Sequence, residues 1–279
     1  MAAPISLIKY QALGNDYLVV DLPAPLNELL ERLPLICDRN FGLGSDGLLA
    51  FDPALMSVRI FNPDRSEAQK SGNGIRITAA HAVLEHGAPD TFTIRTIGRA
   101  NPVRVLRTAG SIVVTELDIG RPSFVAADLP ATFSGSPGRV RLSTPVGEVS
   151  AVLVSVGNPH CVVFGEPVTS TRCRELGPYL ESHAAFPERV NVQLVETLSA
   201  DRARIEIWER GAGYTLASGT SASAVAAALM RESLVGDEVT IVMPGGELPI
   251  RREKDGTLIQ AGPARRVFRA QLELSDLRD

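Results

Sequence analysis

The spacing of hydrophobic and polar positions changes several times along the chain, and each spacing predicts a type of element. Residues 6–22 contain two apolar runs around the turn-forming Leu13-Gly14-Asn15-Asp16, which predicts two strands joined by a turn. From Asn27 to Cys37 apolar residues recur at helical spacing, so we expect one helix there, with Asn27 as its candidate N-cap. Small-residue runs that begin at Gly72 and Ser218 predict two further helices.

The other patterned segments are short, and they either alternate or are apolar throughout, which is typical of strands. They cover residues 48–51, 58–61, 91–95, 103–106, 112–117, 147–156, 161–164, 204–208, 239–243, 248–251, 258–260 and 264–274. A loop rich in Pro, Ser and Gly, about residues 119–138, is the expected junction between two domains. The predicted class is therefore α/β (α+β), with strands in the majority.

The two halves of the chain repeat one another when the sequence is shifted by 147 residues. Ile60-Phe61-Asn62 then falls on Ile207-Trp208-Glu209, and Ser71-Gly72-Asn73 falls on Ser218-Gly219-Thr220. Each copy reads as a strand, a polar loop and a Ser-Gly pair that opens a small-residue helix. We expect a duplicated fold in which two helix N-termini point toward one cleft. Their N–H groups and partial positive charge would suit a carboxylate.

Composition excludes several classes of protein. The 279 residues are 44% hydrophobic and 22% charged, the balance of a folded protein rather than of a disordered chain or a coiled coil. A net charge of −4 argues against nucleic acid or an acidic membrane as partner. With neither a signal-like start nor a long apolar run, we expect a cytoplasmic protein. Cys37, Cys161 and Cys173 lack paired spacing, which favours a reducing compartment.

Three motifs suggest chemistry that their context does not support. Gly42-Leu43-Gly44-Ser45-Asp46-Gly47 fits G-x-G-x-x-G, but a strand follows it where a dinucleotide fingerprint needs a helix. Residues 219–223 lack the last glycine of a nucleophile elbow. The four histidines stand in no ligand pattern, and only three lysines could hold a Schiff-base cofactor. We therefore expect neither a metal nor a cofactor. The histidines are His81, His86, His160 and His183.

A series of short blocks carries a family resemblance. In chain order they are Gly14-Asn15-Asp16, Phe61-Asn62-Pro63-Asp64, Ser71-Gly72-Asn73-Gly74-Ile75-Arg76, Gly157-Asn158-Pro159-His160, Asn191-Val192, residues 208–213, residues 215–220 and Gly262-Pro263-Ala264. The series resembles the diaminopimelate epimerase family of cofactor-free amino-acid racemases. The resemblance extends from Ile8 to about Phe268, nearly the whole chain.

The resemblance implies a fold and a reaction. The family has two pseudo-symmetric domains, each a β-structure wrapped around a central helix, with the active site in the cleft between them. On this chain the domains would be residues 1–118 with 265–279, and residues 119–264. The implied reaction converts LL- to meso-diaminopimelate, a precursor of lysine and peptidoglycan, without cofactor or metal. The implied partners are a small amino-acid substrate and, as the family tends toward dimers, a second copy of the chain.

The chain departs from the family at the reacting centre. The family uses two cysteines across the substrate α-carbon, a thiolate that removes the α-proton and a thiol that returns one. Here both positions are serine, Ser71 and Ser218. Tyr214 stands where the family usually has glutamate, and Ser221 where it usually has glycine. A serine hydroxyl is a much weaker acid than a thiol and needs an adjacent base.

The rest of the implied site is present. By resemblance, Glu209 and His160 lie beside the reacting centre and are the candidate bases. Arg210 would grip the distal carboxylate, and backbone N–H groups of the two helix starts would hold the reacting carboxylate. The full set of implied substrate contacts is Asn15, Asn62, Gly72, Asn73, Asn158, Asn191, Glu209, Arg210, Gly219 and Thr220. Taken singly, each Asn-Asp or Asn-Pro pair is equally typical of a turn.

Several interpretations stay open at this point. The first is an epimerase with altered proton carriers. The second is an isomerase or lyase on the same scaffold that abstracts a proton from one side only, with Glu209 or His160 as base. The third is an amino-acid-binding homologue with impaired catalysis. Changes beside the serines, at Tyr214 and Ser221, favour natural divergence over an engineered pair of Cys→Ser replacements.

Overall fold

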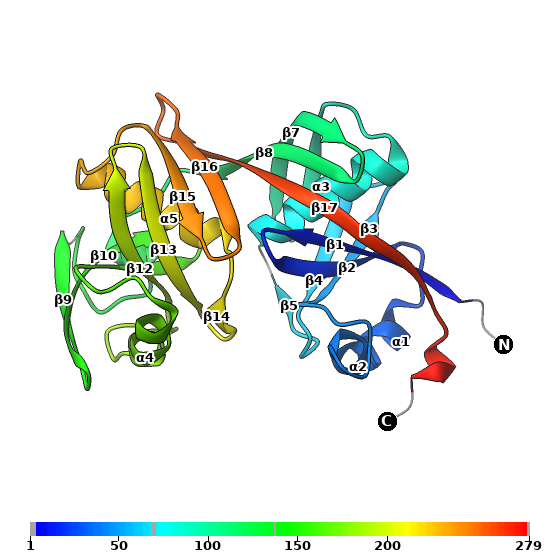
Figure 1. Cartoon of the computed structure of the whole chain (residues 1–279), viewed down its shortest axis with the longest axis horizontal. Coiled ribbons are helices and arrows are strands. Elements are labelled where there is room, and N and C mark those ends of the chain that lie inside the picture. Colours follow the sequence, from blue (N-terminus) through cyan, green and yellow to red (C-terminus); the bar gives the residue numbers. More distant parts are fainter. Residues whose placement is uncertain (1–3, 69–70, 137, 278–279) are drawn as a thin grey trace. The chain divides into compact units, whose positions relative to one another are not determined.

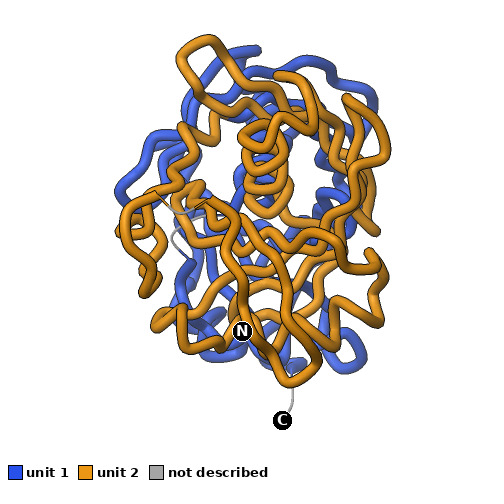
Figure 2. The backbone as a smooth tube through the Cα atoms, turned by 90° about the vertical axis from the view of Figure 1, so that its left-hand side faces the viewer, with its two compact units in different colours: residues 1–117, 262–279 blue, residues 118–261 orange. Residues whose placement is uncertain are grey.

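The computed structural model describes residues 4–68, 71–136 and 138–277. The chain separates into two compact units, residues 1–117 with 262–279 (unit 1) and residues 118–261 (unit 2), drawn in different colours in Figure 2. Across the described residues, no helix is both long enough and apolar enough to span a bilayer. Each unit is described by itself below.

Unit 1 is built from strands that form a closed ring. Its strands are β1 (Ile5–Ala12), β2 (Asn15–Asp21), β3 (Leu48–Asp52), β4 (Ser57–Phe61), β5 (Glu67–Ala68), β6 (Thr91–Thr96), β7 (Arg99–Ala109), β8 (Ile112–Gly120) and most of β17 (Leu258–Leu272). Neighbours pair in the order β17-β1-β2-β3-β4-β6-β7-β8, and β8 pairs back with β17. Strand β5 pairs separately with β4.

The helix α3 (Gly72–His86) packs against the strands of unit 1 (Figure 1). It contacts β1, β2, β3 and β6, and its first eleven residues are all buried. Small side chains allow this burial, because Ala79, Ala80 and Ala82 let the surrounding strands approach closely. The helix ends at Gly87, whose left-handed conformation (φ +64°) is easiest for glycine.

The single helix predicted over residues 27–37 is two helices in the structure. These are α1 (Leu26–Glu31) and α2 (Leu33–Cys37), which meet at Arg32. Pro34 lies in the first turn of α2, where its missing N–H is tolerated, and it cannot continue a preceding helix. The prediction of Asn27 as N-cap is also wrong, since Pro25 occupies that position.

Unit 2 has its own set of strands and two helices. The strands are β9 (Arg139–Thr144), β10 (Gly147–Ser155), β11 (Pro159–Phe164), β12 (Asn191–Ser199), β13 (Arg202–Glu209), β14 (Gly213–Thr215), β15 (Glu238–Met243), β16 (Gly246–Arg252) and the start of β17. They pair in the order β9-β10-β11-β12-β13-β15-β16-β17, with β14 on β13. Helix α5 (Gly219–Arg231), buried as far as Met230, contacts β10, β11, β12, β15 and β16.

The same sequence of pairings occurs in both units. In unit 1, β2 pairs parallel to β3, β3 antiparallel to β4, and β4 parallel to β6. In unit 2, β11 pairs parallel to β12, β12 antiparallel to β13, and β13 parallel to β15. Helix α3 follows β5 just as α5 follows β14. The sparse sequence repeat therefore has a counterpart in strand connectivity.

Helix α4 (Ser170–Glu181) was not predicted from the sequence. Thr169 caps its start by accepting the Arg172 N–H, and Pro178 lies within it. Gly177 faces Trp208 so closely that a Cβ there would lie 2.4 Å from the ring Cγ. A glycine and a proline at the centre of the helical pattern obscured a helix whose inner face packs on β13. Two short 3₁₀ segments, Ala126–Asp128 and Leu274–Asp276, complete the elements.

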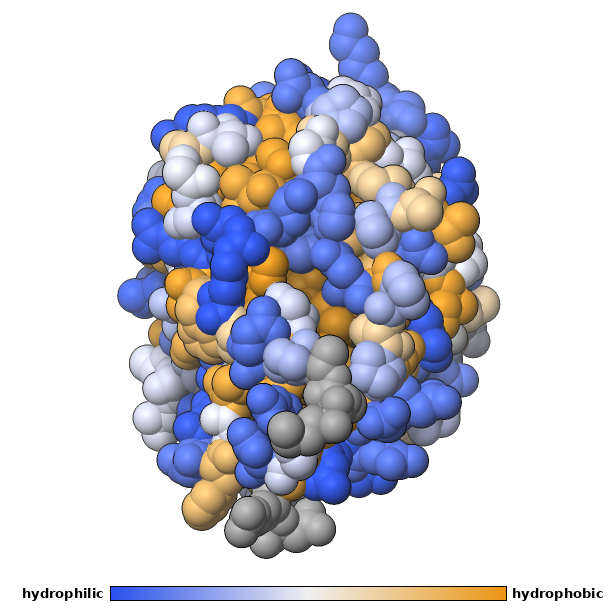
Figure 3. Space-filling view, turned by 90° about the vertical axis from the view of Figure 1, so that its right-hand side faces the viewer, coloured by the Kyte–Doolittle hydropathy of each residue, from blue (hydrophilic) through white to orange (hydrophobic). Residues whose placement is uncertain are grey.

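The outer surface is mixed in polarity. Figure 3 shows hydrophobic and hydrophilic residues interspersed over one face of the molecule. Large apolar side chains such as Phe41 and Leu55 are exposed singly, as is ordinary for folded proteins.

Candidate active site

Ser71 and Ser218, the two expected proton-carrier positions, have equivalent backbone geometry. Ser71 is the N-cap of α3 (φ −146°, ψ 114°), and Ser218 is the N-cap of α5 (φ −145°, ψ 123°). Ser71 Oγ accepts a hydrogen bond from the Gly74 N–H at 3.0 Å, and Ser218 Oγ accepts one from the Ser221 N–H at 3.3 Å. Both caps thus make the same contact with the residue three positions on. Ser71 belongs to unit 1 and Ser218 to unit 2.

In unit 1, a chain of side-chain hydrogen bonds reaches the first turn of α3. Asn15 Nδ2 donates to Asp46 Oδ2 at 2.7 Å, and Asn73 Nδ2 donates to Asn15 Oδ1 at 3.0 Å. The fully buried Arg76 donates to Asn73 Oδ1. Burial lowers the pKa of Arg76 to about 10, so it stays protonated at neutral pH and adds positive charge near the start of the helix.

The glycine-rich loop that resembled a dinucleotide motif supplies Asp46 to this chain of contacts. Asp46 accepts from the Asp16 backbone N–H at 3.0 Å and forms an ion pair with Arg39 at 2.7 Å. Its role could not be seen from the sequence, because the partner Asn15 lies 31 residues earlier.

Asn62 lies in the turn between β4 and β5. Its Nδ2 donates to Ser66 Oγ at 2.9 Å, and its backbone N–H donates to the Ser66 carbonyl at 2.9 Å. Asn62 thus forms the turn that its Asn-Pro-Asp context predicts, and its half-buried side chain belongs to unit 1 together with Ser71.

In unit 2, hydrogen bonds connect a buried histidine to Ser218 through two other side chains. His160 Nε2 lies 3.0 Å from Asn158 Oδ1, and Asn158 Nδ2 donates to Thr220 Oγ1 at 3.5 Å. Thr220 Oγ1 lies 3.3 Å from Ser218 Oγ. Because Thr220 accepts from Asn158, its own hydroxyl hydrogen can be donated to Ser218.

The direction of these hydrogen bonds indicates how His160 could act on Ser218. Asn158 directs its NH₂ group to Thr220, so its carbonyl oxygen accepts from His160 Nε2–H. His160 is fully buried, and along this path Asn158 and Thr220 lie between it and Ser218. In the part of the chain described here, the geometry favours a positioning role for His160.

Hydrogen bonds to backbone N–H groups fix the segment that carries Glu209 and Arg210. Glu209 ends β13 and is half-buried, and the Arg210 backbone N–H donates to Asn191 Oδ1 at 3.0 Å. Arg210 itself is exposed, and its guanidinium donates to the Glu188 carbonyl at 3.0 Å. The Glu181 carboxylate accepts from the Gly211 N–H at 2.9 Å, which fixes the following turn.

The two departures beside the serines have partners within the protein. Tyr214 donates to Glu206 Oε2 at 2.6 Å, and burial together with Glu206 raises the pKa of Tyr214 to about 12. The Arg174 guanidinium lies 4.0 Å from the centre of the Tyr214 ring. Ser221 Oγ accepts from Gln193 Nε2 at 3.0 Å, and both side chains are fully buried.

The three cysteines do not take the place of the missing thiols. Cys37, Cys161 and Cys173 are buried, and burial raises the pKa of each thiol to about 12. At neutral pH they are therefore protonated and unreactive.

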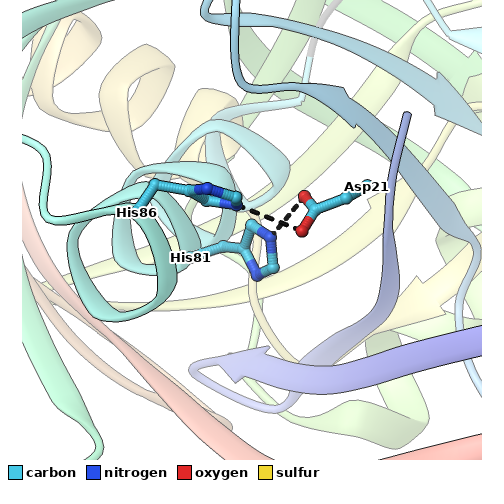
Figure 4. Close-up of side chains that lie close together, drawn as sticks. All are labelled: Asp21, His81 and His86. Carbon is cyan, nitrogen blue, oxygen red and sulfur yellow. Dashed lines mark hydrogen bonds and ion pairs between the residues drawn. The ribbon is translucent and has the colours of Figure 1, made fainter. Parts of the chain in front are cut away.

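One cluster of ionisable side chains that the sequence did not reveal lies elsewhere in unit 1. Asp21 meets His81 and His86 where α3 passes the end of β2 (Figure 4). The two histidines are five residues apart and Asp21 is 60 residues from His81, so the sequence shows no ligand spacing.

Comparisons with known proteins identify the family to which the chain is similar. The family profile of diaminopimelate epimerase matches residues 7–126 and 152–267. Diaminopimelate epimerase 2 of a Nostoc species is 41% identical over 259 residues, 88% of either chain. Diaminopimelate epimerase of a Cyanothece species is 37% identical over 283 residues, with 96% of this chain and 99% of that one covered.

Solved structures are similar in fold at low sequence identity. A predicted epimerase of Pseudomonas aeruginosa superimposes with a TM-score of 0.67 at 19% identity, covering 96% of this chain and 99% of its own. A hydroxyproline epimerase from Agrobacterium vitis, with trans-4-hydroxy-L-proline bound, gives 0.67 at 17% identity, covering 97% and 91%. These matches support a sheet-rich α/β fold with few helices.

Proposed function

This chain belongs to the diaminopimelate epimerase family, and on that premise we propose that it inverts one α-carbon of diaminopimelate, from the LL to the meso form. It is an isomerase of the kind that works without pyridoxal phosphate. The observation that carries the proposal is the equivalent N-cap geometry of Ser71 and Ser218, one in each unit. The family resemblance assigns the two proton carriers to these positions.

The two serines act on opposite faces of one α-carbon in this proposal. The domains would be residues 1–118 with 265–279, and residues 119–264, each a β-structure around one central helix, α3 or α5. Support comes from the repeated strand pairings and from the matching cap geometry.

The proton balance follows from the chemistry of the hydroxyl groups. In this proposal the Glu209 carboxylate, which the family resemblance places beside the reacting centre, accepts the Ser218 hydroxyl proton, and the resulting alkoxide takes the substrate α-proton. The electron pair of the broken C–H bond passes into the adjacent carboxylate as it becomes enolate-like. Ser71 then gives its hydroxyl proton to the opposite face, and its alkoxide takes a proton from solvent. Glu209 releases its proton to solvent, so the reaction changes only the configuration.

Ser218 is the better placed of the two serines to carry negative charge. Among the residues that the structure describes, the Ser218 oxygen can accept hydrogen bonds from the Ser221 N–H and from the Thr220 hydroxyl, both at 3.3 Å, whereas Ser71 Oγ accepts from the Gly74 N–H at 3.0 Å. Hydrogen bonds to the charged form lower a group's pKa. The partial positive charge at the N-terminus of α5 acts in the same direction.

Substrate recognition uses the groups around these serines. Backbone N–H groups of Gly72, Asn73, Gly219 and Thr220 would hold the reacting carboxylate at the two helix starts. Arg210 would bind the distal carboxylate, with Asn15, Asn62, Asn158 and Asn191 shaping the pocket and binding the polar groups of the substrate. Asn191 contributes by accepting a hydrogen bond from the Arg210 backbone N–H.

One-sided proton abstraction is the second candidate function. The weak acidity of a serine hydroxyl favours it, because Glu209 could act directly on the substrate without a return from Ser71. The product would then be a rearranged or eliminated amino acid rather than an epimer. The third possibility is a homologue that binds an amino acid and has impaired catalysis.

Proton exchange distinguishes these functions. The full chain is incubated with LL-diaminopimelate in heavy water, and the α-hydrogen signals are followed by NMR. Deuterium incorporation with formation of the meso isomer supports two-sided transfer. Exchange with retained configuration, or a new product, supports one-sided abstraction. Saturable binding without exchange would refute catalysis on this substrate.

The compartment of the reaction and the oligomeric state of the protein are separate parts of the proposal. The three buried, unpaired cysteines suit a reducing compartment, so we place the reaction in the cytoplasm. Assembly into a homodimer stays a prediction, to be checked by the molar mass in solution.

A further inference from the structure

Two histidines of α3 and one aspartate of β2 form a compact cluster away from the serine N-caps. His81 Nε2 lies 2.8 Å from Asp21 Oδ1, and His86 Nε2 lies 3.1 Å from Asp21 Oδ2. Both rings turn a nitrogen toward the same carboxylate, as Figure 4 shows. His81 is fully buried, whereas Asp21 is 41% and His86 29% exposed. The cluster is thus anchored inside unit 1 and open on one side.

The partner of the other ring nitrogen decides the state of His81. His81 Nδ1 lies 3.2 Å from the Tyr10 hydroxyl, and Tyr10 donates to Glu85 Oε1 at 3.4 Å. Glu85 is a carboxylate paired with Arg266 at 2.6 Å and Arg269 at 2.7 Å, so it accepts. The Tyr10 hydroxyl has one hydrogen, and when that hydrogen is directed to Glu85, the Tyr10 oxygen accepts from His81 Nδ1–H.

In that arrangement the lone pair of a neutral His81 lies on Nε2 and faces a carboxylate oxygen. Two acceptors 2.8 Å apart repel each other unless a positive charge lies between them. Either a proton on Nε2 or a metal cation supplies that charge. A histidine that donates its other N–H to a fixed partner is the usual arrangement for a metal ligand, because the partner holds the tautomer and the ring orientation.

The types and spacing of the ligand atoms suit a divalent transition metal. Two imidazole nitrogens and one carboxylate oxygen form a ligand set used for zinc, with bonds of roughly 2.0–2.2 Å. The three candidate ligand atoms lie within 4.8 Å of one another, close to the roughly 4 Å that two such bonds can span. His86 is partly exposed, so its ring can make the remaining adjustment.

The surroundings leave room for a further ligand. Asp21 and His81 line a cavity of about 330 Å³, together with residues of β1, β2 and the turn that contains Pro23 and Pro25. A site with three protein ligands keeps a coordination position for water or a small ligand. The histidines also lie in the last two turns of α3, where the helix dipole favours a cation.

We propose that Asp21, His81 and His86 bind a divalent transition-metal ion, zinc by ligand type, with a further coordination position toward this cavity. Tyr10 is the positioning residue that orients His81. The ion would tie the C-terminal part of α3 to the end of β2, and it has no part in proton transfer at the serines. The proposal is independent of the proposed epimerase function.

The test measures zinc binding by the full-length chain. After treatment with a chelator and dialysis, the protein is titrated with Zn²⁺ by calorimetry, and retained zinc is counted by elemental analysis. We expect one ion per chain. His86→Gln and Asp21→Asn are each expected to bind at least about tenfold more weakly, and His183→Gln, a histidine of unit 2, to bind like the wild type.

A second variant tests the orientation of His81 without removing a ligand. Tyr10→Phe keeps the ring and loses the hydroxyl, and loss of such a partner is expected to weaken zinc binding about 10- to 100-fold. Substitution with Co²⁺ provides a spectroscopic measurement, because its visible absorption reports on nitrogen and oxygen ligands. Circular dichroism before titration verifies that each variant is folded.

Two outcomes would overturn the proposal. One is a folded wild-type chain that retains no zinc and whose His81 NMR signals report a proton on both ring nitrogens, because the cluster would then be a charged histidine–aspartate ion pair. The other is zinc binding that His183→Gln weakens and His86→Gln leaves unchanged.

Discussion

The Asn191 side chain joins two segments of unit 2 that carry implied substrate contacts. Its Oδ1 accepts from the Arg210 backbone N–H at 3.0 Å, and its Nδ2 donates to the Pro159 carbonyl at 2.9 Å. Asn191 is 5% exposed, and its bond to Pro159 is buried, whereas its bond to Arg210 is partly buried. A single amide thereby fixes the start of the Arg210 turn relative to the Asn158–His160 segment.

Replacing Asn191 by alanine should affect both stability and binding. It leaves a buried carbonyl and an N–H group without their partner, which costs about 1–3 kcal/mol of unfolding free energy. We also expect weaker binding of diaminopimelate, because Arg210 loses its fixed backbone. Urea denaturation and calorimetry measure the two effects.

Asn101→Ala is the matched control for Asn191→Ala. Asn101 is 3% exposed in unit 1, and its Nδ2 donates to the Ile94 carbonyl at 3.1 Å. It should lose similar stability while binding substrate normally. Equal affinity in the wild type and Asn191→Ala would show that this hydrogen bond does not position Arg210.

Restoring thiols at both N-caps should raise epimerase activity. In Ser71→Cys/Ser218→Cys the thiol pKa, about 8.5 in solution and lower at a helix N-terminus, is far better matched to neutral pH than that of a hydroxyl. Matched acid–base groups typically contribute 10²- to 10⁴-fold, so we expect a gain of at least about 10² in the rate of deuterium incorporation with inversion.

A cysteine at an exposed serine of β9, Ser143→Cys, controls for adding a thiol as such. It should leave the rate unchanged. If the double variant binds diaminopimelate and shows no gain, the two caps do not form a proton-transfer pair.

Replacing Gly177 by a larger residue should destabilise the protein. A Cβ at this position meets Trp208 at 2.4 Å, and the indole is held by its hydrogen bond to Glu181 at 2.7 Å. Gly177→Ala therefore forces α4 away from β13, at a cost of about 1–3 kcal/mol or more. Gly236→Ala, where nothing lies within 4 Å, should be close to neutral. Thermal unfolding of both variants tests the contrast.

Local pattern predicted the central helices, because their small-residue runs and serine caps lie within a few consecutive residues. The Ser71 and Ser218 caps could be placed for that reason. Helix α4 was missed because Gly177 and Pro178 are read locally as breaks, whereas contact with Trp208 on another strand favours a glycine there.

The parts of the site that depend on distant partners could not be predicted. Asp46 holds Asn15 across 31 residues, and Asp21 meets His81 across 60, so neither pair leaves a spacing that a single sequence can reveal. The candidate substrate contacts were proposed only because the order of whole motifs resembles a family.

Asp16 should make the stability of the protein depend on pH in the acidic range. Burial alone would raise its pKa, but hydrogen bonds and charge from Arg39 and Lys9 hold the pKa below the ordinary 3.8. A depressed pKa in the folded state means that the ionised carboxylate stabilises the fold above pH 3.8. This contribution is lost as the pH falls below 3.8 through the folded-state pKa.

Asp16→Asn removes this titration. Its unfolding free energy should be lower than that of the wild type at pH 7, and it should fall less steeply below pH 3.8. Denaturant titrations at a series of pH values measure both. Identical slopes for the two proteins would contradict the assignment.

Thr220 offers the sharpest test of how Ser218 is activated. Its hydroxyl lies 3.3 Å from Ser218 Oγ and connects Ser218 to Asn158 and His160. Thr220→Val keeps the shape and removes the hydroxyl, so the alkoxide form of Ser218 loses one of its hydrogen-bond donors. We expect kcat to fall about 10-fold or more with little change in KM, because the hydroxyl acts on the charged form rather than on substrate binding. Thr220→Ser retains the hydroxyl and should recover most of the rate. If valine and serine at this position give the same kcat, then Ser218 is not activated through Thr220.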